Sequence, residues 1–554
     1  MKNLFNNGKS LLFLRQTNIL SAATVIAAAV LAAKILGIIR YWLLAVYIHP
    51  IADLDLFFAA FRIPDFIFQV LVMGTLTTAF IPVIAGFLSC GQQEKAWRAA
   101  STVINAALVI FVVLASIAFF FARDLSIIVA PGLSQNPQNL VALTNLTRIM
   151  LSAQIFFILS NFLSAIIQST KRFLIPALAP VAYNFGIIIG IVLLSPYIGI
   201  YGPAWGVVLG TLLHFLIQVP LIKHIGLRYE AKINLADPGV REIGRLLGPR
   251  TFGLAVAQIS FTVDTALASL LATSSITIIN LSQALQQFPI GIFGATIAQA
   301  ALPTLSEEQA RENLDNFKTT LLNSFHQILF LTLPATALII VLRIPVVRLA
   351  FGVGNSNFPW PLTVLTGKTL AVFGLGIVAQ SLVNLLVRAF YALRDSITPV
   401  KIAVVSFLVN IVLSLTFIVV YKLPVWALAI SSVSGDLVYF LLLLALLDYR
   451  LHFNHRQLLF PAVKMFLAAL ATGIALYIPM KLLDQLVFDT TKTIPLIMLT
   501  GVAGAVGLSV YLFLTWLLDI PELKAFLGLV QRLGQIRQIF TPPAEVLEVV
   551  EEHG

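Results

Sequence analysis

The sequence has little charge and almost no cysteine. Only 11% of its 554 residues are Asp, Glu, Lys or Arg, whereas 59% are hydrophobic and the mean hydropathy is +0.96. A soluble protein of this length needs far more charge on its surface. The single cysteine, Cys90, excludes an intrachain disulfide. The composition therefore indicates an integral membrane protein, and the long apolar runs favour membrane-spanning α-helices over the short alternating strands of a β-barrel.

Motifs for catalysis are missing as well. The stretch "TGKT" at 366–369 lacks the first glycine of a phosphate-binding loop, because Leu362 occupies that position. His452 and His455 have no further residue to complete a zinc set, and there is no nucleophile elbow or Cys-x-x-Cys. We therefore expect no enzyme and no resident cofactor. Any transport would draw on sodium, protons, the membrane potential or the substrate's own gradient.

Long apolar runs divide the chain into about fourteen spans, each about long enough to cross a bilayer. They centre on residues 20–48, 65–89, 102–122, 146–168, 174–196, 200–223, 250–273, 276–303, 325–349, 369–392, 399–421, 424–447, 458–480 and 494–518. We predict an all-α polytopic membrane protein with about 14 transmembrane helices. The net charge of +11 lies in the loops, and no basic domain outside the membrane suggests a nucleic-acid partner.

Charge alternates from one loop to the next. The N-terminal segment is basic, with Lys2, Lys9 and Arg15, and every second loop after it carries cations. Several intervening loops, such as "SPYIGIYG" and "ATSS", carry none. Basic loops tend to stay in the cytoplasm. The alternation predicts an even number of spans with both the N- and the C-terminus cytoplasmic.

The two middle parts of the chain repeat each other weakly. The pair Pro203-x-Trp205 opens the sixth span, and the pair Pro424-x-Trp426 opens the twelfth. Matches six spans apart are typical of transporters built from internal repeats. We predict an N-terminal six-helix half over 1–223, a cytoplasmic linker over 224–249, a C-terminal six-helix half over 250–449, two further helices over 450–520 and a cytoplasmic tail over 521–554. Within the linker, "VREIGRLL" has the pattern of a short amphipathic helix on the membrane surface.

Ionisable residues inside the spans are the strongest functional signal. Each costs about 2.5–3.5 kcal/mol at a helix centre, so each needs a partner or a wet cavity. Lys34 and Arg40 lie six residues apart in the first span, which places them about 9 Å and about 120° apart on a straight helix. Snorkelling or an internal ion pair would explain them. A bend near Gly37 would instead turn both toward one cavity.

Further charges lie in later spans. Asp264 in the seventh span is equally consistent with a structural contact to a neighbouring helix and with an ion-binding site. We interpret Asp436 in the twelfth span and Lys464 in the thirteenth as structural. Arg148 and Arg388 lie closer to helix ends, where long side chains reach the interface.

Several stretches carry a resemblance to a known family. They include "KILGIIRYWLLAVYIHPIADLDLFFAAFRIPDFIFQVLVMGTLTTAFIPV", "QFPIGIFGATIAQAALPTLS" and "RAFYALRDSITPVKIAVVSFLVNIVLSL". They resemble the MurJ/MviN family of lipid II flippases, part of the multidrug/oligosaccharidyl-lipid/polysaccharide exporter superfamily. The resemblance implies two halves in a V around a central cationic cavity for the diphosphate head of lipid II. It also implies a groove between the last two spans for the isoprenoid tail.

The resemblance carries over to some site residues and not to others. Lys34, Arg40 and Asp55 match family positions, which implies that they bind the substrate. The family's usual "NLLRRLFAEG" is "DFIFQVLVMG" here, so Phe68 and Gln69 replace two arginines and Met73 replaces a glutamate. Ala284 replaces an arginine of the eighth span. About half of the expected cationic cluster is therefore missing.

Some family members hold a sodium ion among spans seven, eleven and twelve. The resemblance implies that Asp264 and Asn410 contribute to a cation site here, although Ser414, one turn on, is not a carboxylate. The sequence does not identify the metal.

Together these features predict a flippase for a polyprenyl-pyrophosphate-linked peptidoglycan precursor in the bacterial cytoplasmic membrane. Its partners would be that lipid, membrane lipids and cell-wall synthesis proteins. Two alternatives stay open: an exporter of another lipid-linked glycan or amphiphile, and a non-transporting membrane scaffold for cell-wall proteins.

Overall fold

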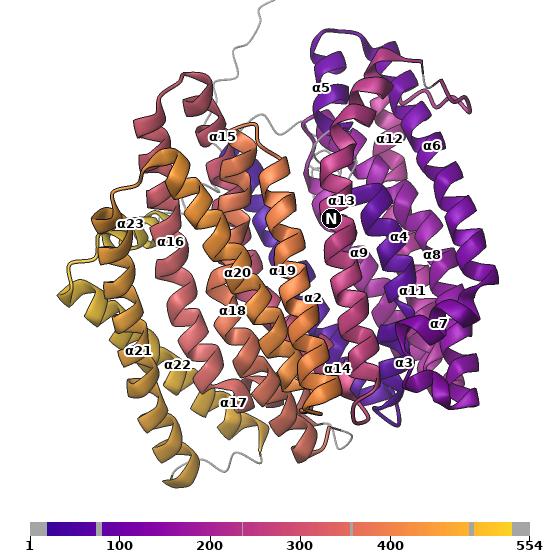
Figure 1. Ribbon diagram of the computed structural model, residues 1–554. Helices are drawn as coiled ribbons and strands as arrows, with labels where there is room; N and C mark the ends of the chain where they lie inside the picture. Colours follow the sequence, from indigo (N-terminus) through magenta and orange to yellow (C-terminus); the bar gives the residue numbers. More distant parts are fainter. Residues whose placement is uncertain (1–18, 74–79, 235, 355–357, 487–491, 535–554) are drawn as a thin grey trace, which may run out of the picture.

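The computed structural model describes residues 19–73, 80–234, 236–354, 358–486 and 492–534. These parts of the chain are helical and form two halves that lie side by side, with the first half at the right of Figure 1 and the second at the left. Thirteen of their helices are long and apolar enough to cross a membrane. The prediction of an all-α membrane protein with about 14 spans is therefore confirmed.

The first half runs from α2 to α12. Its elements are α2 (Ile19–Tyr47), α3 (Asp53–Ala60), α4 (Arg62–Phe68), the π-helix η1 (Gln69–Met73), α5 (Ile81–Ser89), α6 (Gln93–Phe120), α7 (Ala122–Val129), the 3₁₀-helix η3 (Leu133–Gln135), α8 (Pro137–Ser169), α9 (Leu174–Ile189), η4 (Gly190–Leu194), α10 (Ser195–Ile198), α11 (Tyr201–Leu216) and α12 (Val219–Ile225).

The second half runs from α13 to α20, and three helices follow it. The elements are α13 (Pro238–Ser269), α14 (Ser275–Pro289), the π-helix η5 (Ile290–Ala295), α15 (Thr296–Ala310), α16 (Leu314–Val341), α17 (Arg343–Val347), η6 (Arg348–Gly352), α18 (Trp360–Ala392), α19 (Ile397–Leu415), η7 (Thr416–Val420), α20 (Trp426–Leu451), α21 (His455–Leu486), α22 (Thr493–Leu517) and α23 (Pro521–Gly534). Helices α21 and α22 pack on each other and on α16, at the outer side of the second half (Figure 1).

The second span begins earlier than the sequence predicted. Its first helix, α3, begins at Asp53 rather than near residue 65, and a turn at Phe61 separates it from α4. Pro64 does not end the helix, because a proline in the first turn of a helix replaces an N–H that has no intrahelical partner. Arg62 therefore belongs to a helix between the two halves and not to a loop.

Helix α13 begins within the predicted linker, before its membrane-spanning part Thr251–Ser269. Asp237 caps α13, because its Oδ1 accepts hydrogen bonds from the backbone N–H groups of Gly239 (2.8 Å) and Val240 (3.3 Å), and Pro238 occupies the first helical position. The segment "VREIGRLL" therefore forms the first turns of α13 and not a separate helix on the membrane surface.

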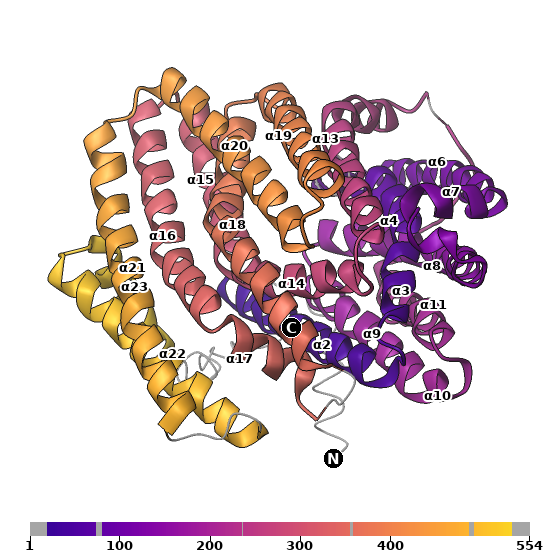
Figure 2. The same ribbon diagram turned by 60° about the horizontal axis from the view of Figure 1, so that its bottom comes forward.

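Helix α2 runs between the two halves. It packs along α9 of the first half and also meets α14 and η6 of the second (Figure 2). We call the end of the bundle where α2 ends and α3 and α14 begin the Asp55 end; it lies at the bottom of Figure 1. The end with α5, α12 and α15 is the opposite end.

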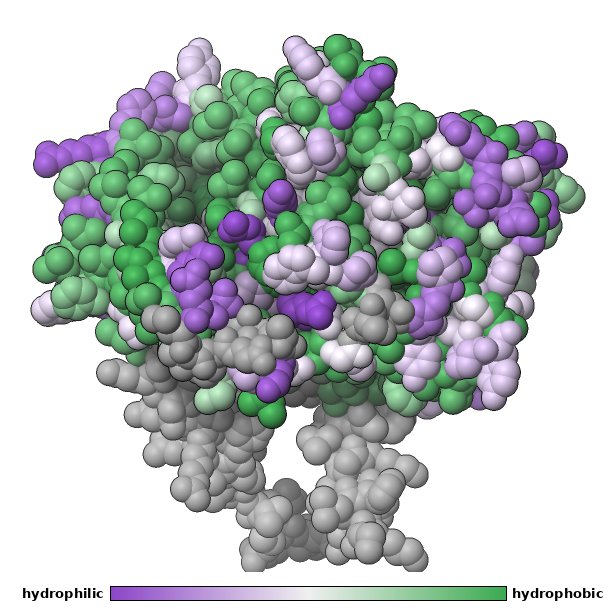
Figure 3. Space-filling model, turned by 90° about the horizontal axis from the view of Figure 1, so that it is seen from below, coloured by the Kyte–Doolittle hydropathy of each residue, from purple (hydrophilic) through white to green (hydrophobic). Residues whose placement is uncertain are grey.

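The outer surface is strongly apolar. Large hydrophobic side chains such as Phe120, Tyr197 and Trp516 are 77%, 87% and 66% exposed. Seen from the Asp55 end, green apolar groups cover much of the surface and purple polar groups form separate patches between them (Figure 3). Exposure on this scale is expected where lipid surrounds the protein.

Candidate functional site

Asp55 joins the two halves at the Asp55 end. Its Oδ1 atom accepts hydrogen bonds from the backbone N–H of Thr277 (2.7 Å) and from the Thr277 hydroxyl (2.6 Å), and only 3% of the residue is exposed. Thr277 lies in the first turn of α14, where backbone N–H groups have no helical acceptor. The carboxylate of one half thus caps a helix of the other, and we call this contact the Asp55 clamp.

Lys34 reaches from α2 to the second half. Its Nζ atom lies 3.5 Å from the Gln287 carbonyl oxygen and 6.0 Å from the centre of the Phe288 ring. A Cβ atom at Gly291 would lie only 2.6 Å from the same Nζ, so this glycine makes room for the ammonium group beside η5. Lys34 is half-buried, and its contacts are with a carbonyl dipole and an aromatic face.

Arg40 faces a different neighbour. Its guanidinium carbon lies 4.8 Å from the centre of the Tyr41 ring, and it interacts electrostatically with Tyr183 on α9 of the first half. Helix α2 is continuous from Ile19 to Tyr47, with no break at Gly37. Lys34 therefore contacts the second half, and Arg40 lies near Tyr183 of the first half.

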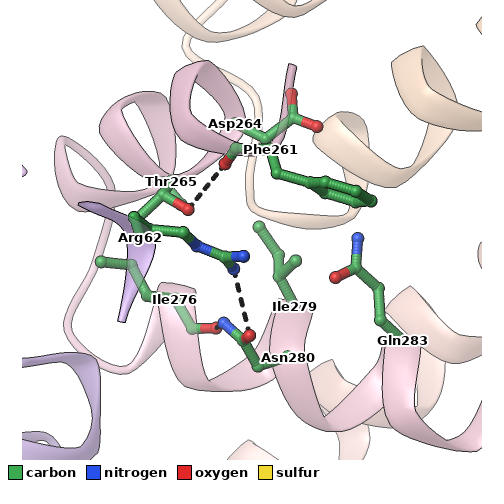
Figure 4. Close-up of a pocket in the computed structure, with 9 residues that line it drawn as sticks. Arg62, Phe261, Asp264, Thr265, Ile276, Ile279, Asn280 and Gln283 are labelled. Atoms are coloured by element: carbon green, nitrogen blue, oxygen red, sulfur yellow. Dashed lines mark hydrogen bonds between the residues drawn. The ribbon is translucent and has the colours of Figure 1, made fainter. Parts of the chain in front are cut away.

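Arg62 is a site residue that the sequence prediction missed. It is the first residue of α4, and its Nη2 atom donates a hydrogen bond to Asn280 Oδ1 on α14 (3.1 Å; Figure 4). The guanidinium carbon lies 6.0 Å from the centre of the Phe261 ring. The motif "AFRIP" contained the signal: an arginine flanked by apolar residues, next to a membrane-spanning run.

A small pocket lies beside Arg62, between α4, α13 and α14. The empty space at the pocket measures about 210 Å³ when the open solvent at its mouth is counted. The lining residues are Arg62, Phe261, Asp264, Thr265, Ala268, Ile276, Ile279, Asn280 and Gln283. In Figure 4 the Arg62 guanidinium and the Asn280 and Gln283 amides extend into the space between the helices.

Asp264 and Asn410 lie in one cluster, as the resemblance implied. The Ser414 hydroxyl donates to Asn410 Oδ1 (3.2 Å) and lies 3.5 Å from Asp264 Oδ1. The Asn410 amide in turn donates to the Ser260 hydroxyl (2.8 Å). Carboxylate, amide and hydroxyl oxygens are the ligands that hard cations prefer, so the residues present fit a small cation such as sodium.

The positions that lack the family's arginines differ in their surroundings. Phe68 is 2% exposed, and its ring centre lies 4.7 Å from that of Phe157 in the core of the first half. Ala284 lies on α14 one turn after Asn280 and is half-buried. A phenylalanine at position 68 thus fills a core site, whereas the alanine leaves a polar stretch of α14 without its cation.

The other intramembrane charges have local partners. Gln380 donates to Asp436 Oδ2 at 2.6 Å, and Lys464 Nζ donates to the Leu518 carbonyl at 2.9 Å. Arg148 Nε donates to the Phe119 carbonyl at 3.2 Å. These contacts link neighbouring helices, which is the structural role that the sequence suggested for Asp436 and Lys464.

Comparisons with known proteins agree with one another. The family model described as "Lipid II flippase MurJ" matches residues 44–497. The "Probable lipid II flippase MurJ" of Vibrio cholerae is 28% identical over 520 residues, covering 92% of this chain and 98% of that protein. The "Lipid II flippase MurJ" of Burkholderia cenocepacia is 29% identical over 397 residues, covering 70% and 76%.

Solved structures show the same fold. The structure "Lipid II flippase MurJ, inward closed conformation" matches with a TM-score of 0.75 and 24% identity, covering 89% of this chain and 98% of that one. An inward-facing multidrug resistance MATE family transporter of the MOP superfamily matches with a TM-score of 0.63 and 13% identity, covering 78% and 98%.

Proposed function

This chain belongs to the lipid II flippase MurJ family, and from that premise we propose that it flips lipid II across the bacterial cytoplasmic membrane. It is a multi-pass membrane transporter that acts through alternating access of its two halves. The observation that carries the mechanism is that Lys34 and Arg62, two cations of the first half, contact α14 of the second half rather than lipid. An anionic head group entering between the halves meets these cations first.

Lys34 and Arg40 would bind the diphosphate of the substrate. An ammonium has three donors and a guanidinium has five, and neither Lys34 nor Arg40 forms an ion pair among the described residues. Charge-assisted hydrogen bonds to phosphate oxygens are stronger than contacts to a carbonyl or an aromatic ring. A diphosphate would therefore draw Lys34 away from Gln287 and loosen its contact with the second half.

Asp55 would act as a gate and not as a ligand of the head group. Its carboxylate already accepts two hydrogen bonds from Thr277 across the halves. Opening the Asp55 end separates α3 from α14 and breaks both bonds. In our proposal both termini and the basic loops are cytoplasmic, so the Asp55 end is the outer face from which the substrate leaves.

Asp264 and Asn410, with Ser414, would hold the coupling cation. A bound sodium ion would neutralise the Asp264 carboxylate within the membrane, which favours the packing of α13 against α19. Support comes from the oxygen cluster, in which the closest approach of Ser414 to Asp264 is 3.5 Å. Protons or the membrane potential could drive transport instead of sodium. An assay in which sodium is replaced by another ion distinguishes these driving forces.

One observation favours a second candidate, an exporter of another polyprenyl-linked glycan. Phe68 is buried in the core, so the site has fewer cations than the family pattern provides. A less charged head group would need fewer of them.

Complementation distinguishes these candidates. The wild-type gene should rescue growth of a strain depleted of its own lipid II flippase, and the double variant Lys34→Ala, Arg40→Ala should not. Matched expression in the membrane serves as the control. Failure of a well-expressed wild type to rescue would favour the other glycan, and full rescue by the double variant would refute the cationic site. A scaffold for cell-wall proteins, which would be a further partner role, predicts rescue by both.

A further inference from the structure

Two cations of the first half meet one face of α14. Asn280, Gln283 and Gln287 are spaced three and four residues apart, so they share that face. Arg62 donates to the Asn280 side chain at one end of the row, and at the other end Lys34 Nζ lies 3.5 Å from the backbone carbonyl oxygen of Gln287, whose side-chain amide donates to Gln380. Seven residues separate the two contacts, which is about 10 Å along the helix. Ala284, where the family has arginine, lies between them.

Arg62 has unused capacity to bind an anion. Its Nη2 atom bonds to Asn280, while its Nε atom is buried and has no hydrogen-bond partner among the described residues. A buried guanidinium N–H without an acceptor is costly. The pocket beside it is also lined by Gln283, whose amide can donate hydrogen bonds, whereas the Thr265 hydroxyl and the Asn280 amide donate to the carbonyls of Phe261 and Ile276. The site thus provides a buried cation and an amide beside empty space, together with the Asp264 carboxylate.

We propose that Arg62 and Asn280 form a second binding position for the anionic group of the transported lipid, one to two helical turns closer to the Asp55 end than the missing arginines. This inference rests on the proposed function. The diphosphate would pass from Lys34 along the amides of α14 to Arg62 before the Asp55 clamp opens. Arg62, six residues before position 68, would thereby take the place of the missing arginine and lies closer to the Asp55 end, where the substrate leaves.

Asp264 competes for the same guanidinium. It lines the same pocket and interacts electrostatically with Arg62, as Asp65 of α4 does more strongly, and its carboxylate is within reach of Ser414. In the absence of a cation, the carboxylate holds Arg62 by charge attraction and repels a diphosphate. Neutralising Asp264 would remove both effects and free Arg62 for the substrate.

Binding by the purified full-length protein in detergent tests the proposal. The probe is farnesyl diphosphate, a short polyprenyl diphosphate, and uncharged farnesol is its matched control. We expect Arg62→Gln to weaken diphosphate binding by roughly tenfold or more, since it removes one charge-assisted contact. Arg148→Gln removes the same charge far from the pocket, at a site bonded to the Phe119 carbonyl, and should bind like the wild type.

Two further variants keep Arg62 in place. Asn280→Asp supplies a carboxylate that pairs with Arg62 and should weaken binding, whereas Asp264→Asn removes the competing charge and should strengthen it. Thermal melting of each variant reports folding, and if Arg62→Gln fails to fold, these two variants decide alone. Equal diphosphate binding by the wild type, Asn280→Asp and every folded Arg62 variant would overturn the proposal. A wild type that binds farnesol as well as farnesyl diphosphate would instead overturn diphosphate recognition, and with it the proposed function.

Discussion

Replacing Asp55 by alanine should open the Asp55 end of the molecule. The substitution removes two hydrogen bonds between a carboxylate and Thr277, at 2.7 and 2.6 Å. Each bond to a charged group contributes about 1.5–3 kcal/mol, so the closed state loses about 3–6 kcal/mol. Because 1.4 kcal/mol corresponds to tenfold, the ratio of open to closed molecules should rise by about two to four orders of magnitude.

Cysteine accessibility measures this shift. Ile276 is 1% exposed in the closed structure and lies beside Thr277. In a Cys90→Ser, Ile276→Cys background, a membrane-impermeant maleimide should label slowly, and Asp55→Ala should accelerate the labelling strongly. Thr277→Val keeps the backbone N–H and removes only the hydroxyl, so its acceleration should be smaller. Unchanged labelling in a folded Asp55→Ala variant would refute the role of the clamp.

Three further predictions concern packing and pH. Gly190→Ala should lower the melting temperature, because its Cβ would lie 2.7 Å from the Gly202 carbonyl oxygen and overpacking costs about 1–3 kcal/mol; Gly504→Ala, which meets nothing within 4 Å, should not. Phe68→Arg should destabilise the protein by several kcal/mol in a melting assay rather than restore a cavity arginine, since position 68 is a core site. Burial raises the pKa of Asp395, but hydrogen bonds from Thr398 and the Arg450 guanidinium at 2.6 Å outweigh it and hold the pKa below its usual value. The carboxylate should therefore stabilise the fold above about pH 4 and lose this effect as the pH falls through the lowered pKa, and melting curves of Asp395→Asn should lack that dependence.

The sequence predicts the number and type of spans well because hydrophobicity and length determine them. Fourteen apolar runs and alternating loop charge leave little freedom for another architecture. Boundaries are less certain, as the second span shows. In the structure the chain is helical up to Ala60, turns at Phe61 and is helical again from Arg62. The composition of this segment does not distinguish that arrangement from a loop followed by a span that begins at Asp65.

Local sequence patterns do not predict the contacts between the two halves. Asp55 and Thr277 are 222 residues apart, so nothing near Asp55 shows that it caps α14. The sequence leaves open which neighbours Lys34 and Arg40 have; in the structure Lys34 lies beside the Gln287 carbonyl and Arg40 beside the Tyr41 ring. The family resemblance implies that Asp264 and Asn410 lie together, because it supplies long-range information that residue spacing lacks; the contact of Ser414 with both is seen only in the structure.

The most direct test of the central claim is flipping of lipid II in proteoliposomes that contain only this protein. Lipid II labelled on its head group should become accessible at the opposite leaflet faster than in protein-free vesicles, and the Lys34→Ala, Arg40→Ala variant should lose most of that acceleration. A wild type that does not exceed protein-free vesicles, or a double variant as active as the wild type, would contradict the account.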